Sequence, residues 1–335
     1  MGHIVDQEQQ LLVRLAWLYY VGGHSQEAIS EQTGISRFKI LRLLSRAREA
    51  KIVKISIDHH SIETHQLADT LIRRFRLVEC IVTPPLGATS DPQADEACAR
   101  HAVGICAAAF LARRLQGATP PVVGLAWGRT IAAMVDEMPK LNRADARFVS
   151  LMGSLSRTAR TNPFEVVQKL AETCGGEAYI LPAPFITDSE EDYQIIMAQS
   201  LVRQTLSLAQ KADFYIASFG DCSMNSFIHQ HGLLSSEEIE DVIASGAVAD
   251  MLGKFFNRDG KLVPSKLNYR TPGVSIDDMT KHEIVLLAAG FAKAQAARAL
   301  LRSGLINRLI VDGDLAKALV LEASSSEGEP DQRGL

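Results

Sequence analysis

The sequence predicts an α/β protein in two parts: an N-terminal helix-turn-helix domain of winged-helix-like form, and a Rossmann-like α/β domain with a mostly parallel sheet. Two short helical patterns separated by a glycine turn occupy residues 26–50. From residue 66, continuous apolar runs alternate with helical patterns, which is typical of parallel strands covered by helices on both faces. A polar segment without periodicity separates these regions. We therefore predict domains at 1–57 and 66–323, a linker at 58–65 and a disordered tail at 324–335.

The composition excludes several classes of protein. The 335 residues are 47% hydrophobic and 22% charged, which excludes a disordered or fibrous chain. We find no signal peptide and no apolar run of the roughly 18 residues that a membrane span requires. The five cysteines have no CxxC spacing, which favours reduced thiols over a zinc site or a disulfide framework. These features predict a cytoplasmic protein with no membrane partner and no metal.

Positive charge is concentrated near the N-terminus. The whole chain has a net charge of −4, yet residues 1–57 contain eight Lys and Arg against five acids. Residues 37–54 contain seven bases and a single acid, Glu49. A cationic stripe on an otherwise acidic chain indicates a module that binds a polyanion, although a solvated helix face is the commoner reason for a basic run.

Three helices are predicted in the first 50 residues. The first runs from an Asp6 N-cap to about residue 20, the second spans 26–32 after the N-cap Ser25, and the third spans 37–50. Gly34 suits the turn between the second and third, and the alternation in 51–57 predicts a short strand. The side chains expected to face the core are Leu11, Leu15, Leu18, Val21, Ile40, Leu41 and Leu44.

This arrangement predicts double-stranded DNA as a partner. In a helix-turn-helix, the second helix of the motif presents its N-terminal residues to the major groove, so Arg37, Phe38 and Lys39 are candidates to reach base edges. The neighbouring polar and basic side chains are placed to contact phosphates. An element that serves only as a subunit interface is the alternative, and the local positive charge argues against it. The predicted DNA-binding residues are Ser25, Gln26, Ser36, Arg37, Phe38, Lys39, Arg42 and Arg46.

The larger domain is predicted to alternate strands and helices. The predicted strands are 78–83, 122–127, 148–152, 178–181, 214–217, 284–288 and 309–311. The predicted helices are 66–75, 95–115, 130–137, 163–173, 192–208, 237–244, 293–302 and 314–321. Ligands of such sheets bind at the carboxyl ends of the strands, where loops lead into helices.

Four loops at predicted strand ends could hold a ligand, at 124–130, 151–156, 218–225 and 289–293. Asp250, which follows the apolar residues 247–249, is predicted to lie at a further strand end. The clearest loop is GLAWGRT, residues 124–130, because the amides of Gly128, Arg129 and Thr130 would point outward at a helix N-terminus, where an anion is favoured. It is neither a P-loop nor GxGxxG, and a plain strand–helix turn is the alternative interpretation. Together, amides and basic groups for a phosphate and carboxylates for hydroxyls fit a small polyhydroxylated phosphate. The predicted effector-binding residues are Gly124, Trp127, Gly128, Arg129, Thr130, Gly153, Ser154, Asp221, Asp250 and Lys293.

These motifs resemble, in order and over nearly the whole chain, the SorC-type family of sugar-responsive bacterial transcription regulators. The resemblance is carried by the helix-turn-helix in 26–48, GLAWGRT (124–130), LMGS (151–154) and AAGFAKAQAARALLRSGLINRLIVD (288–312). It implies a larger domain similar to sugar-phosphate isomerases and deaminases, a phosphorylated sugar as effector, and a tetramer. By position, it places the 128–130 loop and Lys293 at the phosphate, and Gly153, Ser154 and Asp250 at the sugar. The second loop reads Met-Gly-Ser and the fourth Gly-Phe where the family commonly has Gly-Gly, so a smaller polyol or polyol phosphate stays open.

We therefore expect a ligand-responsive repressor of a carbohydrate or polyol catabolic operon. Its expected partners are operator DNA, a small carbohydrate effector and further copies of itself, with no cofactor and no catalytic residue. The alternative is an isomerase- or deaminase-like enzyme with an appended helical domain, in which Asp221 or Asp250 would be the base. The sequence shows no compact acid–base group that favours this alternative.

Overall fold

The computed structural model divides into two compact units, Met1–His59 and His60–Leu335. It describes residues 2–50, 52–53, 61–117, 119–154 and 166–321. The predicted strand at 51–57 therefore lies largely outside the described residues, and residues 58–60 of the predicted linker and the predicted tail at 324–335 lie wholly outside them.

The first unit contains the three predicted helices. They are α1 (Gly2–Ala16), which continues as the π-helical turn η1 (Trp17–Val21), α2 (Gln26–Thr33) and α3 (Arg37–Glu49). Ser25 is the N-cap of α2, because its hydroxyl accepts a hydrogen bond from the amide of Ala28 at 3.1 Å. Gly34 ends α2 at φ +67°, a conformation that glycine adopts without steric cost. The predicted Asp6 cap is wrong, because α1 already begins at Gly2.

A small apolar core joins these helices. Two of the side chains predicted to face it do not: Leu41 is 49% exposed and Val21 is 68% exposed. Leu43 takes the place of Leu41 in the stripe at spacings of three and four, and the π-helical turn displaces Val21 from the α-helical face. The buried apolar residues of this unit are Leu12, Leu15, Ala16, Ile29, Ile40, Leu43, Leu44 and Ala47.

The second unit is built on a seven-stranded parallel sheet, which confirms the predicted α/β class. All seven predicted strands are present, in the order β1-β10-β9-β5-β2-β3-β4, and every neighbouring pair is parallel. The central strands β5 and β9 are buried along their whole length, as their continuous apolar sequences require. The strands are β1 (Glu79–Val82), β2 (Val122–Leu125), β3 (Arg147–Ser150), β4 (Glu177–Tyr179), β5 (Phe214–Ala217), β9 (Ile284–Ala288) and β10 (Arg308–Val311).

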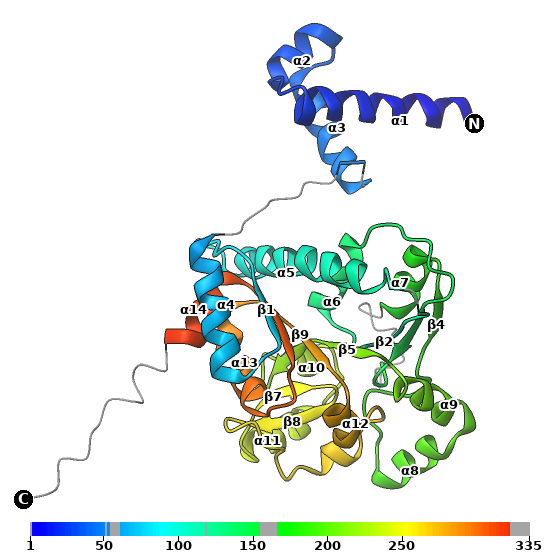
Figure 1. The fold of residues 1–335 in the computed structure, drawn as a ribbon, viewed down its shortest axis with the longest axis vertical. Helices are drawn as coiled ribbons and strands as arrows, with labels where there is room; N and C mark the ends of the chain where they lie inside the picture. The colour runs from blue at the N-terminus through cyan, green and yellow to red at the C-terminus, as the bar shows by residue number, and fades with distance from the viewer. Residues whose placement is uncertain (1, 51, 54–60, 118, 155–165, 322–335) are drawn as a thin grey trace, which may run out of the picture. The chain divides into compact units, whose positions relative to one another are not determined.

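Helices cover both faces of this sheet. Figure 1 shows α5 (Pro92–Arg114), α6 (Arg129–Glu137) and α7 (Val167–Cys174) on one side, and α9 (Ser200–Ala209), α12 (Ile276–Lys281) and α13 (Ala294–Arg302) on the other. The connections from β2 and β3 run toward β4, whereas those from β5 and β9 run toward β1. Because parallel crossovers are right-handed, the two directions place their helices on opposite faces. The strand order therefore reverses between β2 and β5.

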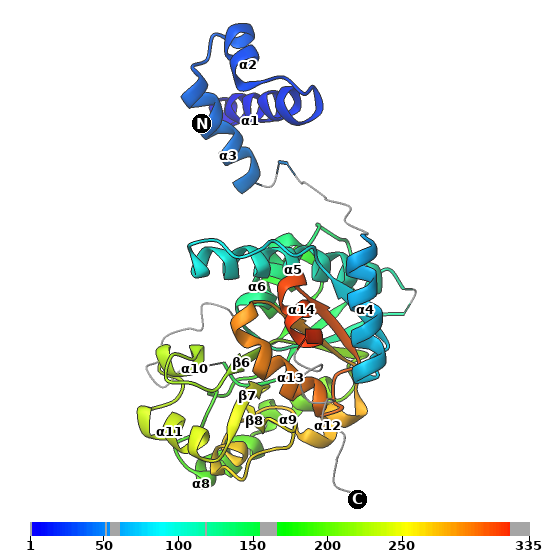
Figure 2. The same cartoon turned by 90° about the vertical axis from the view of Figure 1, so that its left-hand side faces the viewer.

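A second sheet of three antiparallel strands was not predicted. It consists of β6 (Phe219–Asp221), β7 (Ala247–Met251) and β8 (Lys254–Asn257). Figure 2 shows these strands together beside α13. Leu252 and Gly253, at φ +53° and +72°, turn β7 into β8, and this positive-φ pair matches the twist of a two-residue hairpin. Asp250 consequently lies inside β7 rather than at a strand end.

Several helix boundaries differ from the prediction. Helix α4 (Ile62–Phe75) begins within the predicted linker, because Ser61 caps it by accepting from the amide of Thr64. The single helix predicted at 192–208 is two, α8 (Glu190–Ala198) and α9, separated by the extended backbone of Gln199. The predicted helix 163–173 is described only from Val167. Of the other helices, α11 (Ser236–Ala244) and α14 (Gly313–Leu321) were predicted, whereas α10 (Phe227–Gln230), α12, and the 3₁₀ turns η2 (Lys266–Tyr269) and η3 (Phe291–Lys293) were not.

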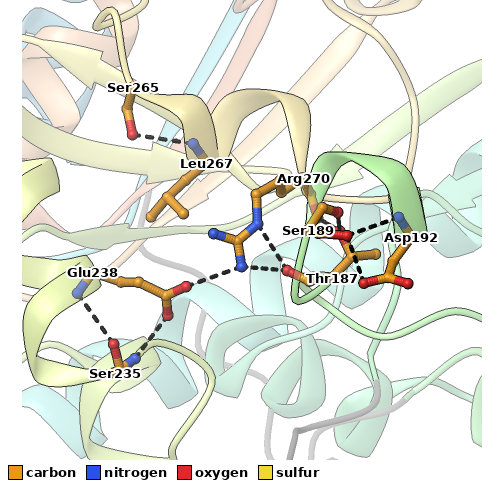
Figure 3. A network of polar contacts seen from close by, with 8 residues as sticks. All are labelled: Thr187, Ser189, Asp192, Ser235, Glu238, Ser265, Leu267 and Arg270. Carbon is orange, nitrogen blue, oxygen red and sulfur yellow. Dashed lines mark hydrogen bonds and ion pairs between the residues drawn. The ribbon is translucent and has the colours of Figure 1, made fainter. Parts of the chain in front are cut away.

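The loop that follows η2 ties the edge of the small sheet to the helices around it. The Arg270 guanidinium donates to the carbonyl of Thr187 at 2.9 Å and to the Glu238 carboxylate at 3.1 Å, as Figure 3 shows. Glu238 also completes a capping box with Ser235 at the start of α11. These charge-assisted hydrogen bonds hold in place the small antiparallel sheet, whose strand β7 contains Asp250.

Candidate functional site

The N-terminus of α3 is an exposed, cationic helix end. Arg37, Phe38 and Lys39 are all exposed, and Phe38 is 88% exposed. The Ser36 hydroxyl makes no capping bond and is also exposed, whereas the Ser25 hydroxyl is used to cap α2. An exposed aromatic ring between two cations suits a surface that a partner covers.

The other predicted DNA-contacting residues lie further along α3 or at the start of α2. Arg42 is exposed one turn further along α3, and Gln26 is partly buried at the start of α2. Arg46 forms an ion pair with Glu8 of α1, and both side chains are about half exposed. This ion pair joins α1 to the C-terminal half of α3.

The second candidate site is a pocket where the strand order of the main sheet reverses. Loops that follow β2 and β5 diverge there toward opposite faces, and such a reversal is where open α/β sheets bind ligands. The loop after β9 and the small antiparallel sheet complete the walls. The residues that line the pocket are Ala126, Trp127, Gly128, Arg129, Thr130, Met152, Ser218, Phe219, Gly220, Asp221, Phe227, Ile228, Asp250, Leu252 and Lys293.

Gly128 brings backbone amides to this pocket. Its φ is +141°, and a Cβ atom there would lie 2.7 Å from the Ser218 Oγ atom, so a side chain would strain the backbone and displace this hydroxyl. Gly128 is the N-cap of α6 and offers no side-chain cap to the first amides of that helix. Thr130 is buried beside them. The first amides of a helix have no partner within it, so this end of α6 can accept an anion.

Basic side chains and one carboxylate form an ionic cluster behind this helix end. Oε1 of Glu96, on α5, lies 2.7 Å from Nη1 of Arg100, 3.4 Å from Nη2 of Arg129 and 3.6 Å from Nζ of Lys293. Burial lowers the pKa of Lys293, and Glu96 partly offsets this effect. Burial would raise the pKa of Glu96, but Lys293, Arg100 and Arg129 together hold it below its ordinary value.

Two carboxylates, those of Asp221 and Asp250, form an acidic wall of the pocket. Asp250 is only 7% exposed, and its Oδ1 atom has no hydrogen-bond partner among the described residues. Burial and the neighbouring Asp221 raise the pKa of Asp250 to about 7, although Lys293 and the Gly220 amide oppose the rise. Burial and the same two carboxylates raise the pKa of Cys222, so its thiol stays protonated. A buried carboxylate oxygen without a partner can accept a hydrogen bond from a ligand hydroxyl.

The structure brings seven of the predicted effector-binding residues together and places three elsewhere. The seven pocket residues are Trp127, Gly128, Arg129, Thr130, Asp221, Asp250 and Lys293. Gly124 is packed inside the sheet, where a Cβ atom would lie 2.5 Å from both Leu151 and Tyr215.

Gly153 and Ser154 are buried outside the lining of the pocket. Their amides donate to the carbonyls of Pro272 and Ala183. The Gly153 carbonyl accepts from the Trp127 indole at 3.1 Å, so this glycine orients a pocket residue instead of lining the pocket.

Several residues of this region were not predicted as effector-binding residues. Met152, Ser218 and Phe227 line the pocket, and Glu96 contacts two of its cations. Met152 ends a predicted strand, Ser218 directly follows one, and both lie in loops that were predicted to hold a ligand. Glu96 lies in a predicted helix, and no local pattern connects it with Lys293.

His229 and His231, the histidines close in sequence to Asp221, already have partners in the fold. Both ring nitrogens of His229 are engaged, with the Met224 carbonyl and the Ser236 hydroxyl, and the His231 ring stacks on Phe227. Within the described ranges no group of three or more His, Cys, Asp or Glu side chains could hold a metal ion. No helix in the described part of the chain is long and apolar enough to span a membrane. The arrangement is suited to binding a polar small molecule.

A cationic helix-turn-helix head and an α/β body with a polar pocket define a ligand-responsive DNA-binding regulator. The family model described as "Putative sugar-binding domain" matches residues 59–321. The erythritol catabolism regulatory protein EryD of Brucella abortus (strain 2308) is 33% identical over 317 residues, which cover 95% of this chain and 98% of EryD. The deoxyribonucleoside regulator of Bacillus subtilis (strain 168) is 26% identical over 94% of this chain and 98% of its own length. The chain belongs to this family of SorC-type, sugar-binding transcriptional regulators, which confirms the resemblance seen in the sequence.

Solved structures agree on the fold. The full-length sorbitol operon regulator SorC from Klebsiella pneumoniae has a TM-score of 0.68 at 23% identity, covering 92% of this chain and 98% of SorC. A DeoR family transcriptional regulator from Listeria monocytogenes also has a TM-score of 0.68, at 24% identity over 77% of this chain and 99% of its own. At these identities the likeness shows the architecture alone.

Proposed function

We propose that this protein is a repressor of a carbohydrate or polyol catabolic operon, released from operator DNA by a small polyhydroxylated effector. The observation that carries the proposal is the pocket at the reversal of strand order, which is lined by the N-terminus of α6, two cations and a buried carboxylate. It supports binding of a sugar or polyol, and the two-domain design supports coupling of that binding to DNA affinity.

The proposed effector carries a phosphate. The Gly128–Thr130 amides, Arg129 and Lys293 are the groups for that phosphate, and Asp221 and Asp250 are the groups for hydroxyls. The name of the Brucella relative refers to erythritol and that of the Klebsiella relative to sorbitol, which favours a polyol chain as the hydroxylated part.

On the DNA side, α3 enters the major groove. Arg37, Phe38 and Lys39 reach base edges. The DNA backbone is contacted by the remaining predicted residues, which are Ser25, Gln26, Ser36, Arg42 and Arg46. We further propose that the protein acts in the cytoplasm as a homotetramer. It has no catalytic activity of its own, a proposal that is supported by the relatives, which are named as regulators.

The test measures ligand binding and DNA binding in the same protein. A thermal-shift screen against free and phosphorylated sugars and polyols identifies a stabilising compound, and an electrophoretic mobility shift with the protein's own promoter measures operator affinity. We expect that compound to weaken operator binding at least five-fold, the lower end of ordinary allosteric coupling. Compounds that stabilise the protein without changing operator affinity would contradict the proposal, and turnover of the stabilising compound would favour an enzyme.

A further inference from the structure

Glu96 is a carboxylate that contacts both cations of the effector pocket without lining the pocket itself. It lies in the second turn of α5, and its Cγ atom comes within 3.0 Å of where a Cβ atom of Gly290 would be. Gly290 thus leaves room for Glu96 to reach Lys293, which follows in η3, and Arg129, at the start of α6. Three elements far apart in the sequence meet at this one carboxylate.

Without a ligand in the pocket, the carboxylate of Glu96 is the counter-ion of the neighbouring cations. Lys293 is largely buried, with 14% of its side chain exposed, and both Glu96 and Asp221 favour its charged form against the effect of burial. Glu96 Oε1 is shared among Arg100, Arg129 and Lys293, and Arg100, at 2.7 Å, is the closest of them. The contacts to Arg129 and Lys293 are longer, at 3.4 and 3.6 Å, so these two are the cations that a second anion can most readily draw away.

We propose that Glu96 competes with the phosphate of the effector for Arg129 and Lys293. A phosphate monoester that binds at the N-terminus of α6 takes these two cations from Glu96, which keeps Arg100. An uncharged polyol binds at the acidic wall and leaves the Glu96 cluster as it is. The proposal rests on the proposed function, because it assumes that this pocket is the effector site.

The experiment compares full-length wild type with Glu96→Gln by isothermal titration calorimetry, with inorganic phosphate and with erythritol as separate probes. Removing the competing carboxylate should tighten phosphate binding at least ten-fold and leave erythritol binding within two-fold. Glu172→Gln is the matched control, because Glu172 is an exposed carboxylate on α7, outside the pocket, and its replacement changes the net charge equally. It should alter neither affinity.

Equal or weaker phosphate binding by Glu96→Gln would overturn the proposal, and so would the absence of phosphate binding in both proteins. Circular dichroism checks that the variant is folded. If it is not, Glu96→Asp replaces it, because the shorter carboxylate keeps the charge but reaches Arg129 and Lys293 less well, and it should show a smaller gain in the same direction. The proposed function fails separately: if neither probe alters operator binding by any of these proteins, the pocket is not the effector site, whatever the phosphate affinities.

Discussion

At the scale of single residues, the protonation of Asp250 links the pocket to the stability of the fold. Its pKa of about 7 exceeds the ordinary 3.8, so between these values the folded chain binds more protons than the unfolded chain. The free energy of unfolding therefore falls as pH rises through this window, because ionising Asp250 in the folded state is costly. Below about pH 4 the carboxyl is protonated in both states, and the cost disappears.

Replacing Asp250 with Asn should remove this dependence on pH. We expect wild type to lose on the order of 3 kcal/mol of unfolding free energy, relative to Asp250→Asn, between pH 4 and 8. Urea unfolding across that range measures the difference. Asp259→Asn, which replaces an exposed carboxyl near β8, is the control and should parallel wild type. Parallel curves for Asp250→Asn and wild type would show that Asp250 ionises as freely as an exposed carboxyl.

Single residues of α3 should separate DNA binding from effector binding. Arg37→Ala and Lys39→Ala each remove an exposed cation from the helix end that enters the groove. Each should weaken operator binding roughly ten-fold, in line with 1–3 kcal/mol for a base contact, while effector-induced thermal stabilisation persists. Mobility shifts measure the first effect and thermal denaturation the second. Lys211→Ala, at an exposed lysine of the second unit, controls for the loss of one charge, and a similar loss of affinity there would refute the assignment of the recognition helix.

At the scale of elements, the two glycines of the GLAWGRT segment have different roles. Gly124 lies inside β2, where a methyl group would press on Leu151 and Tyr215, so Gly124→Ala should destabilise the domain by about 1–3 kcal/mol and leave effector affinity unchanged. Gly128 lies at the pocket, where a methyl group would meet Ser218 at a φ that alanine rarely adopts. Gly128→Ala should therefore weaken effector binding. Chemical denaturation and calorimetry with the stabilising effector distinguish the two effects, and equal loss of affinity in both variants would contradict this division.

The elements that the sequence predicted are those with a strong local pattern. Each of the seven parallel strands is an apolar run between turns, so all were found. Of the small sheet, β6 was missed because Gly220 and Asp221 break up its apolar pattern, and β8 was missed because Lys254 and Asn257 bound it. The break at Gln199 between α8 and α9 has no Gly or Pro to mark it, so tertiary packing decides where that helix ends.

At the scale of the whole molecule, the sequence could predict those pocket residues that directly follow a strand of the parallel sheet. Gly128, Arg129 and Lys293 follow strands of one parallel sheet, and topology alone brings such loops together. Asp250 was predicted because it follows an apolar run of residues. Its burial, and the lack of a partner for its Oδ1 atom among the described residues, depend on the small sheet, which was not predicted. Glu96 could not be found, because only the folded chain brings α5 against η3.

The two units have separate cores, so we expect thermal unfolding in two transitions. The first unit buries eight apolar residues in its own cluster, and a domain of about 60 residues with so small a core is marginally stable. The second unit holds the large sheet and the pocket.

A ligand that binds only one folded unit stabilises that unit by RT ln(1 + [L]/Kd), about 2.7 kcal/mol at a hundred-fold excess over Kd. Differential scanning calorimetry with a stabilising effector should therefore raise the midpoint of the larger transition alone, and operator DNA should raise that of the smaller one. Arg37→Ala should abolish the DNA shift and Gly128→Ala the effector shift. A single transition that both ligands raise would mean that the two units unfold together, and the binding energies could then no longer be assigned to them separately.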